Sequence, residues 1–360
     1  MRAAVCRGFG EALSIEEIEL DRPRDGEVKV AVRACAICHS DIAFADGAWG
    51  GALPAVYGHE AAGTIRAVGP GVRGLSTGQP VVVTLVRACG QCHCCTGGNG
   101  GCCEGDFPRH PASPLSTPDG HSVTHGLKTG AFAEEVVVHA SQVVAIDDAL
   151  SLPTASLLAC GVITGVGAVI NTAQVRPGDN VVVIGTGGVG LNSVQGARIA
   201  GARHIIAVDV AEVKLQAARR FGATETLFAT DPDLAEQVRA ATGGRGADYV
   251  FVTVGAAAAF ATAYGLLAPG GALVVVGMPP SGVTSSFDPG DLAGNGQRIL
   301  GSKMGGGSIH RDIPALIALY RQDRLLLDEL ISGRFALDDI NQAIADVKRG
   351  SALRNVIVFD

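Results

Sequence analysis

One stretch of the chain, residues 180–209, restricts the possible folds more than any other: NVVVIGTGGVGLNSVQGARIAGARHIIAVD. The β-branched run at 181–184 is typical of a strand buried on both faces of a parallel sheet. The chain then passes through a glycine-rich turn into a small-residue helix, and a second apolar run ends in an aspartate. This order of strand, turn, helix, strand and acid predicts a dinucleotide-binding unit.

The glycine turn has the spacing G-x-G-x-x-G, formed by Gly185, Gly187 and Gly190. In that pattern the glycines allow a tight turn, a close approach of the backbone to a pyrophosphate, and close helix–strand packing. The pyrophosphate would lie at the helix N-terminus, beside Gly188 and Val189, where free N–H groups attract anions.

Asp209 stands nineteen residues beyond Gly190, at the end of the second strand. A carboxylate there can accept hydrogen bonds from both hydroxyls of an adenosine ribose. It would repel a 2′-phosphate, so the sequence predicts NAD rather than NADP as the cofactor.

After about residue 151 the pattern alternates between strands and helices. Residues 151–174 predict a small-residue helix or helix pair. The predicted strands are 181–184, 205–210, 225–228, 249–254, 273–278 and 298–303, and the predicted helices between them are 190–201, 213–221, 234–242 and 256–267. Six strands with helical crossovers predict an α/β fold with a Rossmann, doubly wound parallel sheet.

The N-terminal part has a different pattern. Residues 28–32 alternate apolar and polar side chains, as half-solvated antiparallel strands do, and further strand patterns occupy 62–68, 80–86 and 132–138. Strands without intervening helices predict a β-rich domain of about 150 residues. Helices near 313–324 and 340–349 and a strand at 355–359 could return to this domain.

At 360 residues, two domains are expected, each large enough for its own core. A net charge of −7 without any basic block argues against nucleic-acid or membrane-surface partners. The N-terminus lacks the apolar region of a signal peptide, and residues 150–173 are broken by Pro, Thr and Gly. Ten cysteines without an export signal favour metal ligation over disulfides, and we expect a cytoplasmic protein.

The densest cysteine cluster lies in residues 88–104, which hold six cysteines. Four of them, Cys89, Cys92, Cys95 and Cys103, follow C-x2-C-x2-C-x7-C, a spacing that matches a closed, structural tetrahedral zinc site. The neighbouring Cys94 and Cys102 leave the choice of ligands open. One alternative is a set of free or oxidised thiols, against which the surrounding glycines argue because they supply the turns that a wrapped metal needs. The other is a zinc ribbon for nucleic acid, against which the acidic net charge argues.

Several motifs together resemble those of the zinc-dependent medium-chain alcohol dehydrogenases, and the resemblance runs nearly end to end. They are listed here in chain order: Cys38-His39-Ser40-Asp41, Gly58-His59-Glu60, the four cysteines just described, Leu158-Ala159-Cys160-Gly161, residues 185–190 with Asp209, and Leu353-Arg354-Asn355. The resemblance implies a GroES-like catalytic domain (residues 1–161 and 304–360, with a structural zinc lobe at 88–104) and a Rossmann NAD-binding domain (162–303). It also implies an active site between the two domains.

By this resemblance, Cys38, His59 and Cys160 would hold a catalytic zinc, so that the chain would bind two Zn²⁺. Three protein ligands and one open position are the catalytic zinc arrangement, which polarises an alcohol oxygen. Asp41 would orient His59. Glu60 adjoins the site; it is either an occasional ligand or a buried acid paired with a cation.

The resemblance also assigns the proton and cofactor contacts. Ser40 would take the substrate proton, although it could equally cap the following helix. The family's relay histidine is replaced here by Ala43, so water or His39 would have to carry the proton away. The expected cofactor contacts are listed together: His39 and Arg354 to the pyrophosphate, Lys214 to the ribose, and Thr164 and Val189 to the nicotinamide.

Trp49, Leu85 and Met278 would line an apolar pocket for a medium-sized aliphatic, terpenoid or aromatic alcohol, although each could instead be core. The expected activity is reversible oxidation of an alcohol to an aldehyde or ketone with NAD, by a homodimer or homotetramer. One alternative is glutathione-dependent formaldehyde dehydrogenase, which carries an acid where Trp49 stands. Another is a non-catalytic dinucleotide-binding protein of the same fold.

Overall fold

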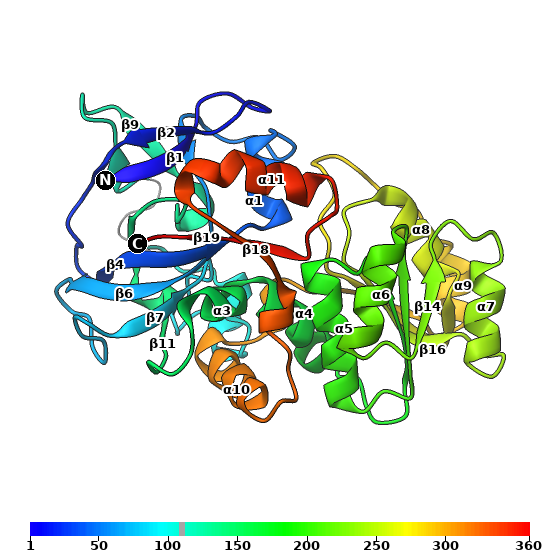
Figure 1. Cartoon of the computed structure of the whole chain (residues 1–360). Coiled ribbons are helices and arrows are strands. Elements are labelled where there is room, and N and C mark those ends of the chain that lie inside the picture. The colour runs from blue at the N-terminus through cyan, green and yellow to red at the C-terminus, as the bar shows by residue number, and fades with distance from the viewer. Residues whose placement is uncertain (108–111) are drawn as a thin grey trace. The chain divides into compact units, whose positions relative to one another are not determined.

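A computed structural model describes residues 1–107 and 112–360 (Figure 1). The chain divides into two compact units. The first unit comprises Met1–Gly161, Ser308–Tyr320 and Leu327–Asp360, and the second comprises Val162–Gly307 and Arg321–Leu326.

The second unit is built on a six-stranded sheet in which every pairing is parallel. Its strands lie in the order β14-β13-β12-β15-β16-β17, the doubly wound order. Their bounds are β12 Asn180–Ile184, β13 His204–Asp209, β14 Glu225–Phe228, β15 Ala247–Val252, β16 Leu267–Val275 and β17 Arg298–Gly301. The predicted Rossmann sheet is confirmed.

Helices and helical turns precede, connect and follow these strands. Their bounds are α4 Gly161–Gly167, the π-helical turn η5 Ala168–Ala173, α5 Gly188–Ala200, α6 Glu212–Phe221, α7 Leu234–Ala241, α8 Ala257–Tyr264, α9 Pro289–Gly294 and the 3-10 turn η6 Met304–Gly306. Val182 and Ile184 of β12 and Ile206 and Val208 of β13 pack in one core cluster with residues of α7 and α8. These four residues share one face of the sheet because successive side chains of a strand point to opposite faces.

The α8–β16 connection differs from the prediction. A helix was expected up to residue 267 and a strand only from 273, but β16 begins at Leu267, where it pairs with Ala247. The register then shifts before Tyr249 pairs with Ala272. The residues between, which include Pro269 and Gly270, carry no apolar periodicity from which this irregular start could be read.

The first unit is β-rich and holds two sheets. One has the order β2-β1-β5-β9-β8-β3; the other has β11-β7-β6-β4-β19-β18, with β10 also paired to β4. The strand bounds are β1 Arg2–Cys6, β2 Ser14–Glu17, β3 Glu19–Leu20, β4 Glu27–Ala36, β5 Ala55–Val56, β6 Glu60–Val68, β7 Pro80–Val83, β8 Leu115–Ser116, β9 Ser122–His125, β10 Glu135–His139, β11 Val143–Ala145, β18 Ile331–Phe335 and β19 Arg354–Val358.

Short helices complete the first unit. They are α1 His39–Ala45, α2 His93–Thr96, α3 Leu152–Ser156, α10 Ile309–Arg321 and α11 Ile340–Lys348, with 3-10 turns η1 Gly100–Cys102, η2 Gly126–Lys128, η3 Ala140–Gln142, η4 Leu157–Ala159, η7 Asp328–Leu330 and η8 Leu337–Asp339. The C-terminal strand β19 pairs antiparallel with β4, so the chain end returns to this unit as expected.

Strand β4 is more buried than its alternating sequence predicts. Only Lys29 and Arg33 are half-exposed, whereas the other residues of the strand are buried on both faces. Helix α3 packs against β4 and β6, so this sheet has little face open to water. Among the described residues, no single helix is long and apolar enough to cross a membrane; Leu152–Ala159 and Gly161–Ala173 reach that length and apolarity only when counted together as a bent pair.

Candidate metal centre and dinucleotide site

A buried cluster in the first unit joins Cys38, His59, Glu60 and Cys160. Their potential ligand atoms all lie within 4.8 Å of one another. Cys38 precedes α1, His59 and Glu60 stand at the start of β6, and Cys160 follows η4. Two thiols, an imidazole and a carboxylate from three distant parts of the sequence therefore meet at one point.

Asp41 holds two of these segments in place. Its Oδ1 lies 2.8 Å from Nδ1 of His59 and accepts the backbone N–H of Gly58 at 2.9 Å, while its Oδ2 accepts the N–H of Cys38 at 3.1 Å. Gly58 is required here because its φ is +94° and a Cβ would lie 2.6 Å from the backbone nitrogen of Phe132. One carboxylate thus fixes the backbone at both Cys38 and His59.

The chemistry of the cluster fits a metal ion. With Nδ1 of His59 against Asp41, its Nε2 is buried and has no hydrogen-bond partner among the residues that the structure describes. An orphaned buried imidazole nitrogen is costly unless something binds it. The thiol of Cys160 holds the pKa of the Cys38 thiol well below its usual range, and the pKa of Cys160 is raised in turn. Burial opposes a charge on His59, but Asp41 and Cys38 together outweigh it and raise the imidazole pKa. Zn²⁺ prefers this set of sulfur and nitrogen donors.

Glu60 forms a buried ion pair with Arg354. Their Oε1 and Nη1 atoms lie 3.2 Å apart, and Nη1 also donates to the carbonyl of Ile37 at 3.1 Å. Burial raises the pKa of Glu60 to about 8, against the opposing charge of Arg354. Gly161 leaves room for the guanidinium, because a Cβ there would lie 2.0 Å from Nη2 of Arg354. Glu60 therefore has a cation partner and also adjoins the cluster.

A second group, in residues 88–104, brings together Cys89, Cys92, Cys95 and Cys103 with their sulfur atoms within 4.8 Å of one another. Cys94 lies outside this group, and so does Cys102. These are the four cysteines that the sequence spacing selects.

Backbone N–H groups point at the sulfurs of this second group. Cys89 Sγ accepts from the N–H of Cys92 at 3.3 Å, and Cys103 Sγ accepts from those of Cys89 and Gly105 at 3.2 and 3.3 Å. The N–H groups of Glu104 and Cys95 lower the pKa of the Cys92 thiol to about 6. A loop that directs backbone N–H groups at these sulfurs fits a structural zinc site.

The glycine loop of the second unit has the geometry that its sequence predicts. Gly185 has φ +88°, and a Cβ on Gly190 would lie 1.8 Å from the carbonyl oxygen of Gly185. Gly187 caps helix α5, whose first residue is Gly188. A Cβ on Gly187 would meet no atom of residues 1–107 or 112–360 within 4 Å. Open space therefore adjoins the helix end at Gly187, which fits a pyrophosphate.

Asp209, at the end of β13, is almost fully buried and is surrounded by donors. Its Oδ2 accepts from the backbone N–H of Thr186 at 2.7 Å and from the Thr186 hydroxyl at 3.1 Å. Its Oδ1 accepts from the N–H groups of Val210 and Ala211 at 2.8 and 3.1 Å. The hydroxyl of Thr186 was not singled out from the sequence, although the residue lies inside the glycine motif.

The remaining predicted contacts are distributed over both units. His39 and Ser40 are the first two residues of α1; His39 is exposed and Ser40 is half-exposed. In the second unit, Thr164 donates to the Met304 sulfur at 3.7 Å, and Val189 and Lys214 lie half-exposed in α5 and α6. Their roles stay predictions.

Of the predicted pocket residues, Trp49 and Leu85 lie half-buried in the first unit, and Met278 lies exposed in the second. The Trp49 ring packs edge-on against Phe44 at 5.1 Å, and Phe44 stacks on Tyr57 at 5.9 Å. The first unit therefore has a cluster of three aromatic rings that includes Trp49.

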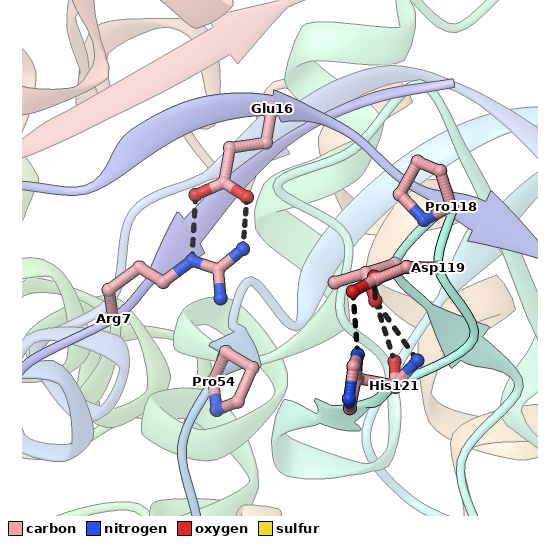
Figure 2. A pocket seen from close by; sticks show the side chains of 7 residues that line it. Arg7, Glu16, Pro54, Pro118, Asp119 and His121 are labelled. Carbon is pink, nitrogen blue, oxygen red and sulfur yellow. Dashed lines mark hydrogen bonds and ion pairs between the residues drawn. The ribbon is translucent and has the colours of Figure 1, made fainter.

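A surface hollow of about 400 Å³ lies elsewhere on the first unit (Figure 2). Two charged pairs line this hollow. Arg7 pairs with Glu16 through two hydrogen bonds of 3.0 and 2.6 Å, and Nδ1 of His121 lies 2.8 Å from Asp119. These charged groups satisfy one another, and none belongs to either cysteine cluster.

Comparison with known proteins defines the class. Residues 24–148 match the alcohol dehydrogenase GroES-like domain, and residues 188–322 match the zinc-binding dehydrogenase domain. The protein is thus an oxidoreductase that acts on small-molecule alcohols.

Similar proteins agree along the whole length. The chain is 36% identical to an NDMA-dependent alcohol dehydrogenase of Amycolatopsis methanolica, covering 99% of this chain and 98% of that one. Two solved structures have TM-scores of 0.94: an alcohol dehydrogenase zinc-binding domain protein of Burkholderia ambifaria (35% identity, 100% and 98% coverage) and the benzyl alcohol dehydrogenase of Acinetobacter calcoaceticus (32%, 100% and 99%). The chain belongs to the zinc-dependent medium-chain alcohol dehydrogenase family.

Proposed function

We propose that this protein is an NAD-dependent alcohol dehydrogenase with two zinc ions per chain, which oxidises aromatic or other medium-sized apolar alcohols. The observation that carries the proposal is the orphaned, buried Nε2 of His59 beside the thiols of Cys38 and Cys160. These three residues would hold the catalytic zinc. A zinc ion bound there would supply Lewis-acid chemistry and lower the pKa of an alcohol hydroxyl.

Ser40 has the role of accepting the substrate's hydroxyl proton at its Oγ. Its half-exposed position two residues after Cys38 supports this role. Ala43, on the same helix, carries no base, so the proton would leave Ser40 through water or the exposed His39. This route differs from a relay that ends in a histidine at residue 43.

The four-cysteine lobe would hold the second zinc in a structural role. All four ligand positions would be filled by thiolates, which leaves no site for a substrate. The N–H groups directed at Cys89, Cys92 and Cys103 support that ligand set.

NAD is proposed as the cofactor, and it would supply the hydride acceptor. The open space at Gly187, which caps the N-terminus of α5, supports binding of the NAD pyrophosphate there. Asp209 supports NAD over NADP through its negative charge, since a 2′-phosphate beside this carboxylate would be repelled. Because four protein donors already contact Asp209, ribose hydroxyls would have to share its oxygens.

The cluster of Phe44, Trp49 and Tyr57 supports an aromatic substrate, because rings favour offset and edge-on contacts with other rings. The similar solved structure from Acinetobacter calcoaceticus is named for benzyl alcohol, which makes this alcohol the first to test.

Assembly as a homodimer or homotetramer is also proposed. Strand β17 is an edge of the six-stranded sheet, and it carries Ile299 with 40% of its surface exposed. Met278 and Phe287 are also exposed in the second unit. Unpaired edges and exposed apolar side chains favour association with another chain. Light scattering tests this; a monomer at micromolar concentration would contradict it.

The test of function is an alcohol panel, with benzyl alcohol first, assayed with NAD and with NADP. We also run it with NDMA present, because the Amycolatopsis methanolica relative is described as dependent on it. Oxidation of an aromatic alcohol with NAD is expected. Failure to oxidise any alcohol under all of these conditions would refute the proposal.

A further inference from the structure

Thr186 contacts Asp209 in a way that the glycine motif alone does not require. Its side chain is fully buried, and both its N–H and its hydroxyl donate to Oδ2 of Asp209. With Val210 and Ala211 on Oδ1, each oxygen of the carboxylate accepts hydrogen bonds from two protein donors. Any ligand that reaches Asp209 meets a carboxylate whose orientation is already fixed.

The hydroxyl differs from the other three donors because it belongs to a side chain. The N–H groups of Thr186, Val210 and Ala211 are set by the backbone of the glycine loop and of the turn after β13. Only the hydroxyl can be removed by substitution without changing the backbone. Valine has the same shape as threonine and lacks this donor.

We infer that Thr186 is a positioning residue for cofactor choice: its hydroxyl holds the Asp209 carboxylate in one orientation, so that it accepts a ribose diol and rejects a 2′-phosphate. The inference rests on the proposed role of Asp209 in binding NAD. A carboxylate whose orientation is fixed by hydrogen bonds cannot turn away from an approaching phosphate.

The same loop provides a matched control. The hydroxyl of Thr253 donates to the carbonyls of Gly185 at 2.6 Å and Ile184 at 3.1 Å. This hydroxyl supports the glycine loop. In the described part of the chain it makes no hydrogen bond to Asp209. Loosening the loop through Thr253 should affect NADH and NADPH alike, because both share the pyrophosphate that the loop faces.

The experiment measures dissociation constants of NADH and NADPH by fluorescence for wild type, Thr186→Val, Thr186→Ala, Thr186→Ser and Thr253→Val. Loss of one hydrogen bond to a charged group should weaken NADH binding about three- to tenfold in both the Val and the Ala variants. NADPH binding should stay unchanged or improve, so the preference for NADH falls. Thr186→Ser should restore the preference, and Thr253→Val should leave the ratio as in wild type.

A double-mutant cycle shows whether the effect passes through the carboxylate. In an Asp209→Asn background, Thr186→Val should no longer change the NADH to NADPH ratio. Equal weakening of both dinucleotides by Thr186→Val, tighter NADH binding, or an undiminished effect in the Asn background would overturn the inference while leaving the proposed function intact. A wild-type ratio in Asp209→Asn itself would instead overturn the proposed role of Asp209. Thermal unfolding of each variant verifies that the fold is kept.

Discussion

Oδ1 of Asp41 lies 2.8 Å from Nδ1 of His59, and both side chains are buried. The contact leaves Nε2 of His59 directed at the cluster with Cys38 and Cys160. Hydrogen bonds of this kind fix the tautomer and orientation of a ligating histidine. Asp41→Asn should therefore lower metal affinity or activity about 10- to 100-fold without removing any ligand. Zinc titration and kcat/KM measure the effect; unchanged values for both would contradict it.

Replacing His59 with Ala should abolish alcohol oxidation and leave NADH binding nearly intact. The residues proposed for the dinucleotide, around Gly187 and Asp209, belong to a different group in the sequence and to the second unit. Activity assays and NADH fluorescence titration test this together. Parallel loss of activity and of dinucleotide affinity would speak against separate sites.

The four-cysteine lobe and the cluster of Cys38, His59 and Cys160 together predict two zinc ions per chain, one in each group. Cys92→Ser should lower the zinc content by about one ion and reduce stability, because metal binding at a closed site is coupled to folding. Cys94→Ser is the matched control: it lies two residues away, outside the cluster, and should keep both ions. Elemental analysis of both variants measures the number of zinc ions per chain. Equal zinc loss in the two variants would show that the proposed ligand set is wrong.

Two glycines of the loop should respond differently to alanine. In Gly187→Ala the new Cβ meets no atom of the described part of the chain within 4 Å, so the unfolding temperature should not change. It would occupy space proposed for the pyrophosphate, and NADH affinity should fall about tenfold or more. In Gly190→Ala the Cβ would lie 1.8 Å from the Gly185 oxygen, so stability should fall as well. If Gly187→Ala binds NADH normally, the pyrophosphate lies elsewhere.

Asp209→Gly should lower kcat/KM with NAD and narrow the gap to NADP. Removing the carboxylate eliminates its repulsion of a 2′-phosphate, a change of about tenfold or more in the ratio of the two kcat/KM values. The cofactor ratio of wild type and variant is measured with one good alcohol. A wild-type preference for NADP, or a ratio that the substitution does not change, would exclude Asp209 as the discriminating residue.

Local patterns predicted the second unit well because its strands are buried and β-branched and its glycines have steric roles. The run at 181–184 and the glycines at 185 and 190 lie where the sequence indicates. The start of β16 could not be predicted, because pairing with β15 rather than local periodicity determines it.

Within the candidate sites, the sequence predicted which residues take part better than it predicted which residues contact one another. Spacing selected the four lobe cysteines, whereas the meeting of Cys38, His59 and Cys160 was expected only from the family resemblance. The four donors around Asp209 and the two-segment role of Asp41 depend on where separate loops meet in space. No pattern along the chain encodes those distances.

Alcohol oxidation with NAD should depend on a metal ion held by Cys38, His59 and Cys160. The most direct measurement is the rate of NADH formation from NAD and benzyl alcohol, taken on one preparation as purified, after a chelator has removed its zinc, and after zinc is restored. We expect NADH formation in the protein as purified, no NADH formation after the zinc is removed, and recovered NADH formation after zinc is restored. Undiminished turnover in protein that elemental analysis shows to be free of metal would contradict it.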